Sequence, residues 1–179
     1  MTRTAWTLAC LLLFCSTRTH ADDCRAPDPH IRSNDREIVA AITDATDRSA
    51  TFRDLVARLN RSDVVVYVSF DTASPAGLAG RTTFVSAAGG RRYLRIQIDR
   101  RAAGCRRLGI LGHELRHAVE IADAAAVTSD TSLAALYREI GFGGTQGREM
   151  RFESDAAVNA GRDVEREVLA SGSAAGRAQ

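Results

Sequence analysis

The segment LGILGHELRHAVEIAD, residues 108–123, constrains the fold more than any other part of the sequence. Apolar side chains recur at helical spacing along one side of it: Leu108, Leu111, Leu115, Ala118 and Ala122. A helix with so continuous an apolar stripe is buried. Three titratable residues, His113, Glu114 and His117, lie within the same helix. Burying them without partners would cost several kcal/mol, so we expect them to share a partner.

These three residues form the pattern H-E-x-x-H. Residues four apart lie one turn apart on the same helix face, so His113 and His117 can both bind one ion. Glu114 is rotated by about 100° from His113, so it borders the ion without having to bind it. A glutamate in this position can take a proton from metal-bound water. The pattern predicts a site for one Zn²⁺, with Glu114 as general base.

Two histidines are too few for a stable zinc site, so a third ligand is required. Asp123 matches the spacing H-E-x-x-H-x-x-G-x-x-D, but Glu120 replaces the glycine that would turn the chain back. The helix is then expected to continue, which carries Asp123 about 15 Å along its axis. Glu120 itself suits a supporting or salt-bridging role better than a ligand role.

A second source for the third ligand is the last helix, which we predict from about Arg148 to Ala170. Its apolar stripe consists of Ala157, Ala160, Val164 and Val168. Glu153 lies four residues before this stripe, on the apolar side, where a carboxylate needs a partner. Glu149 lies one turn earlier on a similar face. We therefore expect Glu153 to be the third ligand, with Glu149 as the alternative.

The remaining elements predict an α+β fold. Asn34 and Glu37 form a capping box for one helix, and Ser49 caps the next. The segments 63–70, 81–87 and 91–99 read as three strands, and the glycines of 88–90 as a hairpin turn. In the last strand Leu94, Ile96 and Ile98 alternate with polar residues, so one face meets the core.

Beyond the 108–123 helix, we predict a further helix around residues 133–140. Asp130 or Thr131 is expected to cap it and Gly141 to end it. The segment GFGGTQG, residues 141–147, reads as a glycine-rich loop. Together these assignments describe a small, mostly antiparallel sheet of about three strands packed against the 108–123 helix. Helices flank this unit on the N- and C-terminal sides.

The N-terminal segment indicates export. Residues 1–21 have an arginine-bearing start, an apolar stretch and a small-residue end, which is the layout of a secretory signal peptide cleaved after Ala21. We expect a secreted or periplasmic protein with no membrane attachment after cleavage. Residues 22–170 then form one domain, and residues 171–179 a disordered tail. Cys24 and Cys105 would remain and are expected to form a disulfide.

Charge argues against a nucleic-acid partner. All 24 basic residues are arginines, against 22 acidic residues, and cleavage would remove Arg3 and Arg18. The net charge of the remaining chain is then about zero. Its arginine pairs are interleaved with acids instead of forming a basic stripe, so nucleic-acid binding is not supported.

The motif HELRH, followed downstream by the glutamate of RFESDA, resembles the gluzincin group of zincin metallopeptidases. The likeness covers residues 108–161 by motif, and the preceding strands by topology alone. It implies a zincin-like fold and an exported zinc peptidase that acts on peptide or protein substrates, with His113, His117 and Glu153 as ligands. It also implies an edge strand that binds extended peptide, for which AGRTTFVSAAGG, residues 79–90, is our choice.

The sequence departs from the family pattern after the ligand glutamate. Gluzincins usually carry an acidic residue four positions later that supports a histidine, and this chain has Ala157 there. Asp155, Glu120 or Asp123 are candidates for that role. Tyr137 is a candidate oxyanion donor, although its position on an apolar helical stripe favours a core role. The alternative function is a metalloprotease-like binding module without turnover.

Overall fold

The computed structural model describes residues 29–71, 78–146 and 149–175, and these ranges contain five helices and six strands. The helices are α1 (Arg36–Arg48), α2 (Ala50–Asn60), α3 (Gly104–Asp123), α4 (Asp130–Ile140) and α5 (Asp155–Ala175). The strands are β1 (Ile31–Arg32), β2 (Val64–Asp71), β3 (Gly80–Ala88), β4 (Arg91–Asp99), β5 (Phe142–Gln146) and β6 (Glu149–Glu153). The predicted α+β class is confirmed.

The main sheet has four strands in the order β1-β2-β4-β3. The predicted hairpin of β3 and β4 is present, and it turns at Gly89 and Gly90, whose positive φ angles suit glycine. The prediction of a mostly antiparallel sheet of three strands was wrong, because β2 runs parallel to both β1 and β4. Strand β3 lies on the far side of β4 instead of between β2 and β4, so β2 and β4, which run in the same direction, are neighbours and pair in parallel.

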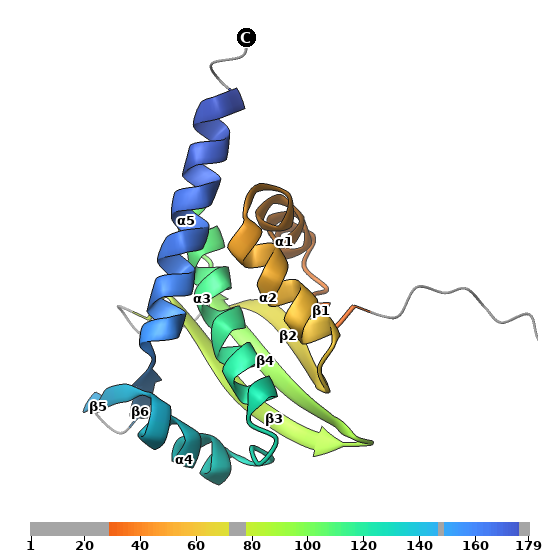
Figure 1. The fold of residues 1–179 in the computed structure, drawn as a ribbon, viewed down its shortest axis with the longest axis vertical. Coiled ribbons are helices and arrows are strands. Elements are labelled where there is room, and N and C mark those ends of the chain that lie inside the picture. The colour runs from red at the N-terminus through yellow and green to blue at the C-terminus, as the bar shows by residue number, and fades with distance from the viewer. Residues whose placement is uncertain (1–28, 72–77, 147–148, 176–179) are drawn as a thin grey trace, which may run out of the picture.

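Helices α1, α2 and α3 lie against one face of this sheet, and α5 packs on α3 (Figure 1). The predicted alternation of β4 is confirmed, since Leu94, Ile96 and Ile98 are fully buried and Arg95 is exposed. Side chains of β2 meet the same helices, and the core residues of both strands are Val64, Val66, Val68, Leu94, Ile96 and Ile98. The core therefore lies between the sheet and the helical layer, with α3 in its centre.

Helix caps follow the sequence closely, with shifts of one or two residues. Ser49 caps α2 as predicted, through a hydrogen bond from the backbone N–H of Phe52. Asp35, not Asn34, caps α1, because its carboxylate accepts the N–H of Glu37. Ser129 caps α4, where we had predicted Asp130 or Thr131, and Gly141 ends α4 as predicted.

The C-terminal segment differs most from the prediction. The expected glycine-rich loop contains β5, and the first residues of the expected last helix form β6, which pairs with β5 in an antiparallel hairpin. Helix α5 begins only after Ser154, whose hydroxyl accepts the backbone N–H of Ala157 and so caps the helix. It continues to Ala175, so residues 171–175 of the predicted disordered tail are helical.

Several predictions fall on other parts of the chain. The predicted signal peptide, Cys24 and residues 176–179 lie outside the described residues. Cys105 is half-buried and has no disulfide within the described ranges. None of the helices that the structure describes combines the length and hydropathy that crossing a membrane requires.

A buried arginine of β4 fixes where α3 ends. Arg92 is 4% exposed, and its guanidinium binds the carboxylate of Asp63 through Nε and Nη2 at 2.8 and 2.7 Å. Its Nη1 donates to the carbonyl oxygens of Ile121 and Ala124 at 2.6 and 2.7 Å. These two oxygens also accept the backbone N–H groups of Ala124 and Val127, and Nη2 of Arg92 donates to the carbonyl oxygen of Ala122 at 3.0 Å. Arg92 therefore adds hydrogen bonds to the end of a helix, where carbonyl groups lack the regular helical partners.

We expect Arg92→Met to lower the free energy of unfolding by about 1–2 kcal/mol, because it removes the hydrogen bonds of a buried guanidinium to these carbonyl oxygens, while the exposed Asp63 carboxylate can turn to water. Arg95→Met is the matched control, since Arg95 lies on the same strand and is exposed. Urea unfolding followed by circular dichroism measures both variants. Equal stability of the two variants would contradict the anchoring role of Arg92.

The pair of Arg92 and Asp63 also makes the stability of the fold depend on pH in the acidic range. The hydrogen bond from Arg92 lowers the pKa of Asp63. A carboxyl group with a lowered pKa in the folded state stabilises the fold above its unfolded pKa, about 4, and loses this effect as pH falls. Stability measured from pH 7 down to pH 3 should therefore fall less steeply in Arg92→Met than in the wild type.

Candidate metal site

The site depends on a close approach of α3 and α5. A Cβ atom built on Gly109 would lie 3.0 Å from the carbonyl oxygen of Gly161, and one built on Gly112 would lie 2.7 Å from Cγ2 of Val164. A Cβ atom on Gly161 would in turn lie 3.0 Å from Cβ of His113. Only glycine allows the two helix backbones to come this close. The beginning of α5, and the end of β6 before it, are thereby placed beside the histidines of α3.

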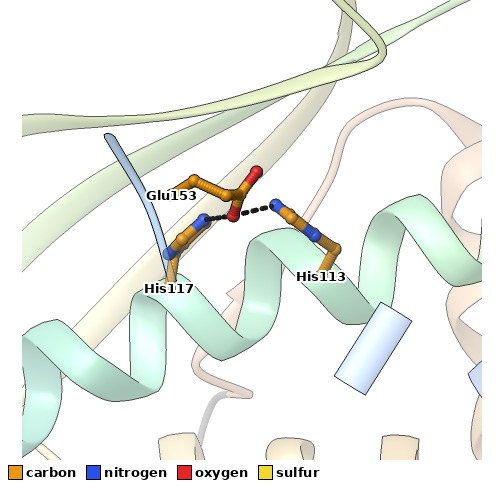
Figure 2. A group of neighbouring side chains, drawn as sticks. All are labelled: His113, His117 and Glu153. Atoms are coloured by element: carbon orange, nitrogen blue, oxygen red, sulfur yellow. Dashed lines mark ion pairs between the residues drawn. The ribbon is translucent and has the colours of Figure 1, made fainter. Parts of the chain in front are cut away.

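His113, His117 and Glu153 converge on one point (Figure 2). Oε1 of Glu153 lies 3.1 Å from Nε2 of His113 and 3.2 Å from Nε2 of His117. A tetrahedral metal ion with bonds of 2.0–2.2 Å separates its ligand atoms by about 3.3 Å, so the spacing suits such an ion. This group of three donors can hold a metal ion. Glu153 reaches it from the end of β6, and not from a helix as we had predicted.

The other acidic candidates do not join this group. Asp123 lies at the surface, where its carboxylate contacts Arg58 Nη2 at 2.5 Å. Asp155 is exposed in the first turn of α5. Glu149 belongs to β6, and its side chain lies outside the part that the structure describes.

Glu120 contacts the imidazole of His117 on the side opposite Glu153. It thus takes the place of the acidic residue that the family pattern has at the position of Ala157. Nδ1 of His117 lies 2.9 Å from Oε2 of Glu120, and Tyr137 donates to the same oxygen at 3.2 Å. The hydroxyl of Tyr137 also lies 2.9 Å from Nδ1 of His117. Tyr137 is buried, as its apolar stripe predicted, but its hydroxyl is engaged at the side of the imidazole away from Glu153.

The charge states of His117, Glu120 and Glu153 depend on one another. Burial by itself would lower the pKa of His117, but its contacts with Glu120 and Glu153 raise the pKa to about 9. Burial would likewise raise the pKa of Glu153, yet the hydrogen bonds with the two imidazoles hold it far below its usual value. Without an ion, a proton on His117 therefore balances the carboxylates. A metal ion bound here competes with that proton.

Glu114 is placed beside the donor group and under β3. It is 5% exposed, and Thr82 donates a hydrogen bond to its Oε2 at 2.7 Å. A Cβ atom on Gly80 would lie 2.5 Å from its other carboxylate oxygen, so β3 passes directly over the carboxyl group. Burial raises the pKa of Glu114.

The sequence patterns did not identify three residues of the site: Gly80, Thr82 and Ser154. A glycine at the start of a strand can signal a close backbone approach, as Gly80 shows here. A serine before an acidic residue and two alanines is a helix-start signal, which would have placed the beginning of α5 correctly. Thr82 carried no signal that separates it from any threonine of a strand.

A cleft of about 820 Å³ opens over these groups. It is bounded by β3, α3, α4, the start of α5 and Glu153, and His113, Glu114 and His117 line it. Strand β3 is an edge strand of the main sheet, as we had predicted. The group that could hold a metal ion therefore lies in a cleft, and one wall of the cleft is a strand whose outer edge has no strand partner among the described residues.

No protein-family model, no curated protein and no solved structure matches this chain. The resemblance to gluzincins thus stays an interpretation of the motif.

The donor group predicts one divalent metal ion per chain, and Glu153→Ala should lower its affinity at least tenfold because one of three protein ligands is lost. Glu149→Ala is the matched control from the same strand and should bind as the wild type does. Isothermal titration with Zn²⁺ or Co²⁺ as the probe measures both. Loss of binding in Glu149→Ala, with binding kept in Glu153→Ala, would reverse the ligand assignment.

Proposed function

We propose that this protein is a zinc-dependent peptidase that hydrolyses peptide bonds in its cleft. The observation that carries the proposal is the convergence of His113, His117 and Glu153 on one point, with the carboxylate of Glu114 adjacent to it in the same cleft. The assignment rests on this site and on the H-E-x-x-H pattern, because no family supports it.

The donor set favours zinc among the divalent ions. Two imidazole nitrogens and one carboxylate oxygen are a common protein ligand set of catalytic zinc, which keeps its fourth position open. Harder ions such as Mg²⁺ and Ca²⁺ prefer an all-oxygen shell. A zinc ion held here would lower the pKa of a coordinated water and polarise the carbonyl group of a substrate.

Glu114 has the properties of a general base. Its carboxylate is oriented by Thr82, and burial raises its pKa, so it binds a proton more readily than an exposed glutamate does. It can accept a proton during attack on the peptide carbonyl and then deliver that proton to the leaving amine.

The wall formed by β3 supports a peptide as the substrate. Within the described ranges, no strand pairs with the outer edge of β3, and an edge of this kind can bind an extended chain through its backbone groups. A cleft volume of about 820 Å³ lies within the range of ligand-binding sites.

A binding module that holds zinc without turnover is the second candidate. The observation that favours it is the burial of Glu114, which leaves little of the carboxylate open to the cleft. Both functions use the same metal ion and differ only in catalysis. A substitution of Glu114 therefore distinguishes them, whereas substitutions of the histidines do not.

We expect Glu114→Gln to keep zinc at the wild-type level and to lose peptide hydrolysis by at least about 100-fold, since general base catalysis contributes 10²–10⁴ in rate. Glu165→Gln, which changes another carboxylate of the cleft wall, is the control and should retain activity. Turnover of a diverse peptide library and zinc content are measured on the same samples. If the wild type binds zinc and cleaves no peptide, the binding module is the correct reading.

Gly80→Ala tests the placement of Glu114. The added methyl group would occupy the position of its carboxylate oxygen, so we expect hydrolysis to fall about tenfold or more, with zinc affinity nearly unchanged. Ser86→Ala, at an exposed position of the same strand, is the matched control. A Gly80→Ala protein with wild-type turnover would show that the contact between β3 and Glu114 does not matter for catalysis.

A further inference from the structure

We propose that Glu120 and Ser154 are positioning residues that set the metal affinity of the site by joining α3 to the beginning of α5. This inference rests on the metal-binding part of the proposed function and does not depend on catalysis. Neither residue belongs to the donor group itself. Both act through the ligands: Glu120 through His117, and Ser154 through Glu120 and Glu153.

Glu120 fixes which nitrogen of His117 is free to bind a metal. An imidazole that binds through Nε2 must carry its proton on Nδ1, and a carboxylate beside Nδ1 fixes both this tautomer and the ring orientation. Oε2 of Glu120 lies 2.9 Å from Nδ1 of His117, and both side chains are buried. Tyr137 donates to the same carboxylate oxygen and so limits its movement.

Ser154 connects this support to the third ligand. Its hydroxyl donates to Oε1 of Glu120 at 2.6 Å, and its backbone N–H donates to Oε1 of Glu153 at 3.1 Å. That oxygen of Glu153 is the one that faces both imidazoles. Ser154 is 3% exposed and Glu120 is 6% exposed, so the contact between them is shielded from bulk water.

The capping role of Ser154 does not by itself explain a serine at this position. The hydroxyl accepts the N–H of Ala157 while it donates to Glu120. An ionised aspartate caps a helix as well as serine does, but it has no proton to donate to Glu120. A single hydroxyl group serves both contacts at once, which an ionised aspartate at this position cannot do.

The test measures zinc affinity by competition with a chelator of known affinity. We expect Glu120→Gln to weaken zinc binding about 10–100-fold, the range found when carboxylates that support a metal-binding histidine are replaced. Ser154→Ala should weaken it about three- to tenfold, and Ser154→Thr, which keeps the hydroxyl, should restore it. In the double variant the loss should be smaller than the product of the two single losses, because Ser154 acts partly through Glu120.

Ser49→Ala is the control for a purely structural effect. Ser49 is also a buried serine that caps a helix, but it caps α2, remote from the donor group. Its replacement should lower thermal stability and leave zinc affinity unchanged. The absorption spectrum of the Co²⁺-substituted protein adds a second readout, since loss of His117 orientation changes the coordination geometry.

Three results would overturn the inference. In the first, the wild type binds zinc, and the zinc affinities of Ser154→Ala and Glu120→Gln are within about twofold of the wild-type affinity. The two residues are then structural only, and the proposed function stands. If Ser154→Ala and Ser49→Ala weaken zinc binding equally, the effect comes from general stability. A wild type that binds no zinc overturns both this inference and the proposed function.

Discussion

The close contact between α3 and α5 is the constraint on which the rest of the site depends. Gly109 and Gly112 on α3, and Gly161 on α5, let the two backbones approach to a distance that any side chain would prevent. Since α5 begins directly after β6, this contact also fixes where the end of β6 lies. A glutamate at that end then faces two histidines that lie 36 and 40 positions earlier in the chain.

A core that contains so many titratable groups is stable only if they satisfy one another. Glu114, His117 and Glu120 all lie on the buried side of α3, and each has a partner from a different element: β3, β6 and the start of α5. The contacts leave one site, between the two Nε2 atoms and Glu153, where a positive charge is needed. The raised pKa of His117 favours a proton there, and a metal ion held by the three donors would take the place of that proton.

The sequence predicted α3 and the position of His113 and His117 on one face of it well, because helical periodicity and the H-E-x-x-H spacing are local. It identified Glu153 for a wrong reason: the four-residue step back from Ala157 assumed a helix, whereas Ser154 caps α5 and Glu153 belongs to a strand. The pairing of β5 with β6 and the parallel run of β2 beside β4 are set by distant contacts, which alternation within one strand does not reveal. The support of His117 by Glu120 was left among three candidates, since only tertiary contacts with Tyr137 and Ser154 distinguish them.

The burial of Glu114 is the feature on which the choice between a peptidase and a silent zinc module depends. A carboxylate removed from water is a stronger base, because its charged form has lost hydration, and a base near neutrality is what hydrolysis requires. The same burial is unfavourable if no substrate or water ever reaches the group. Thr82 and Gly80 hold the carboxylate against β3, the strand whose open edge lines the cleft, so an extended chain bound along that edge would run past Glu114. Burial by the strand that would bind the substrate is a reason for catalysis, whereas burial by an inner layer of the core would have argued against it.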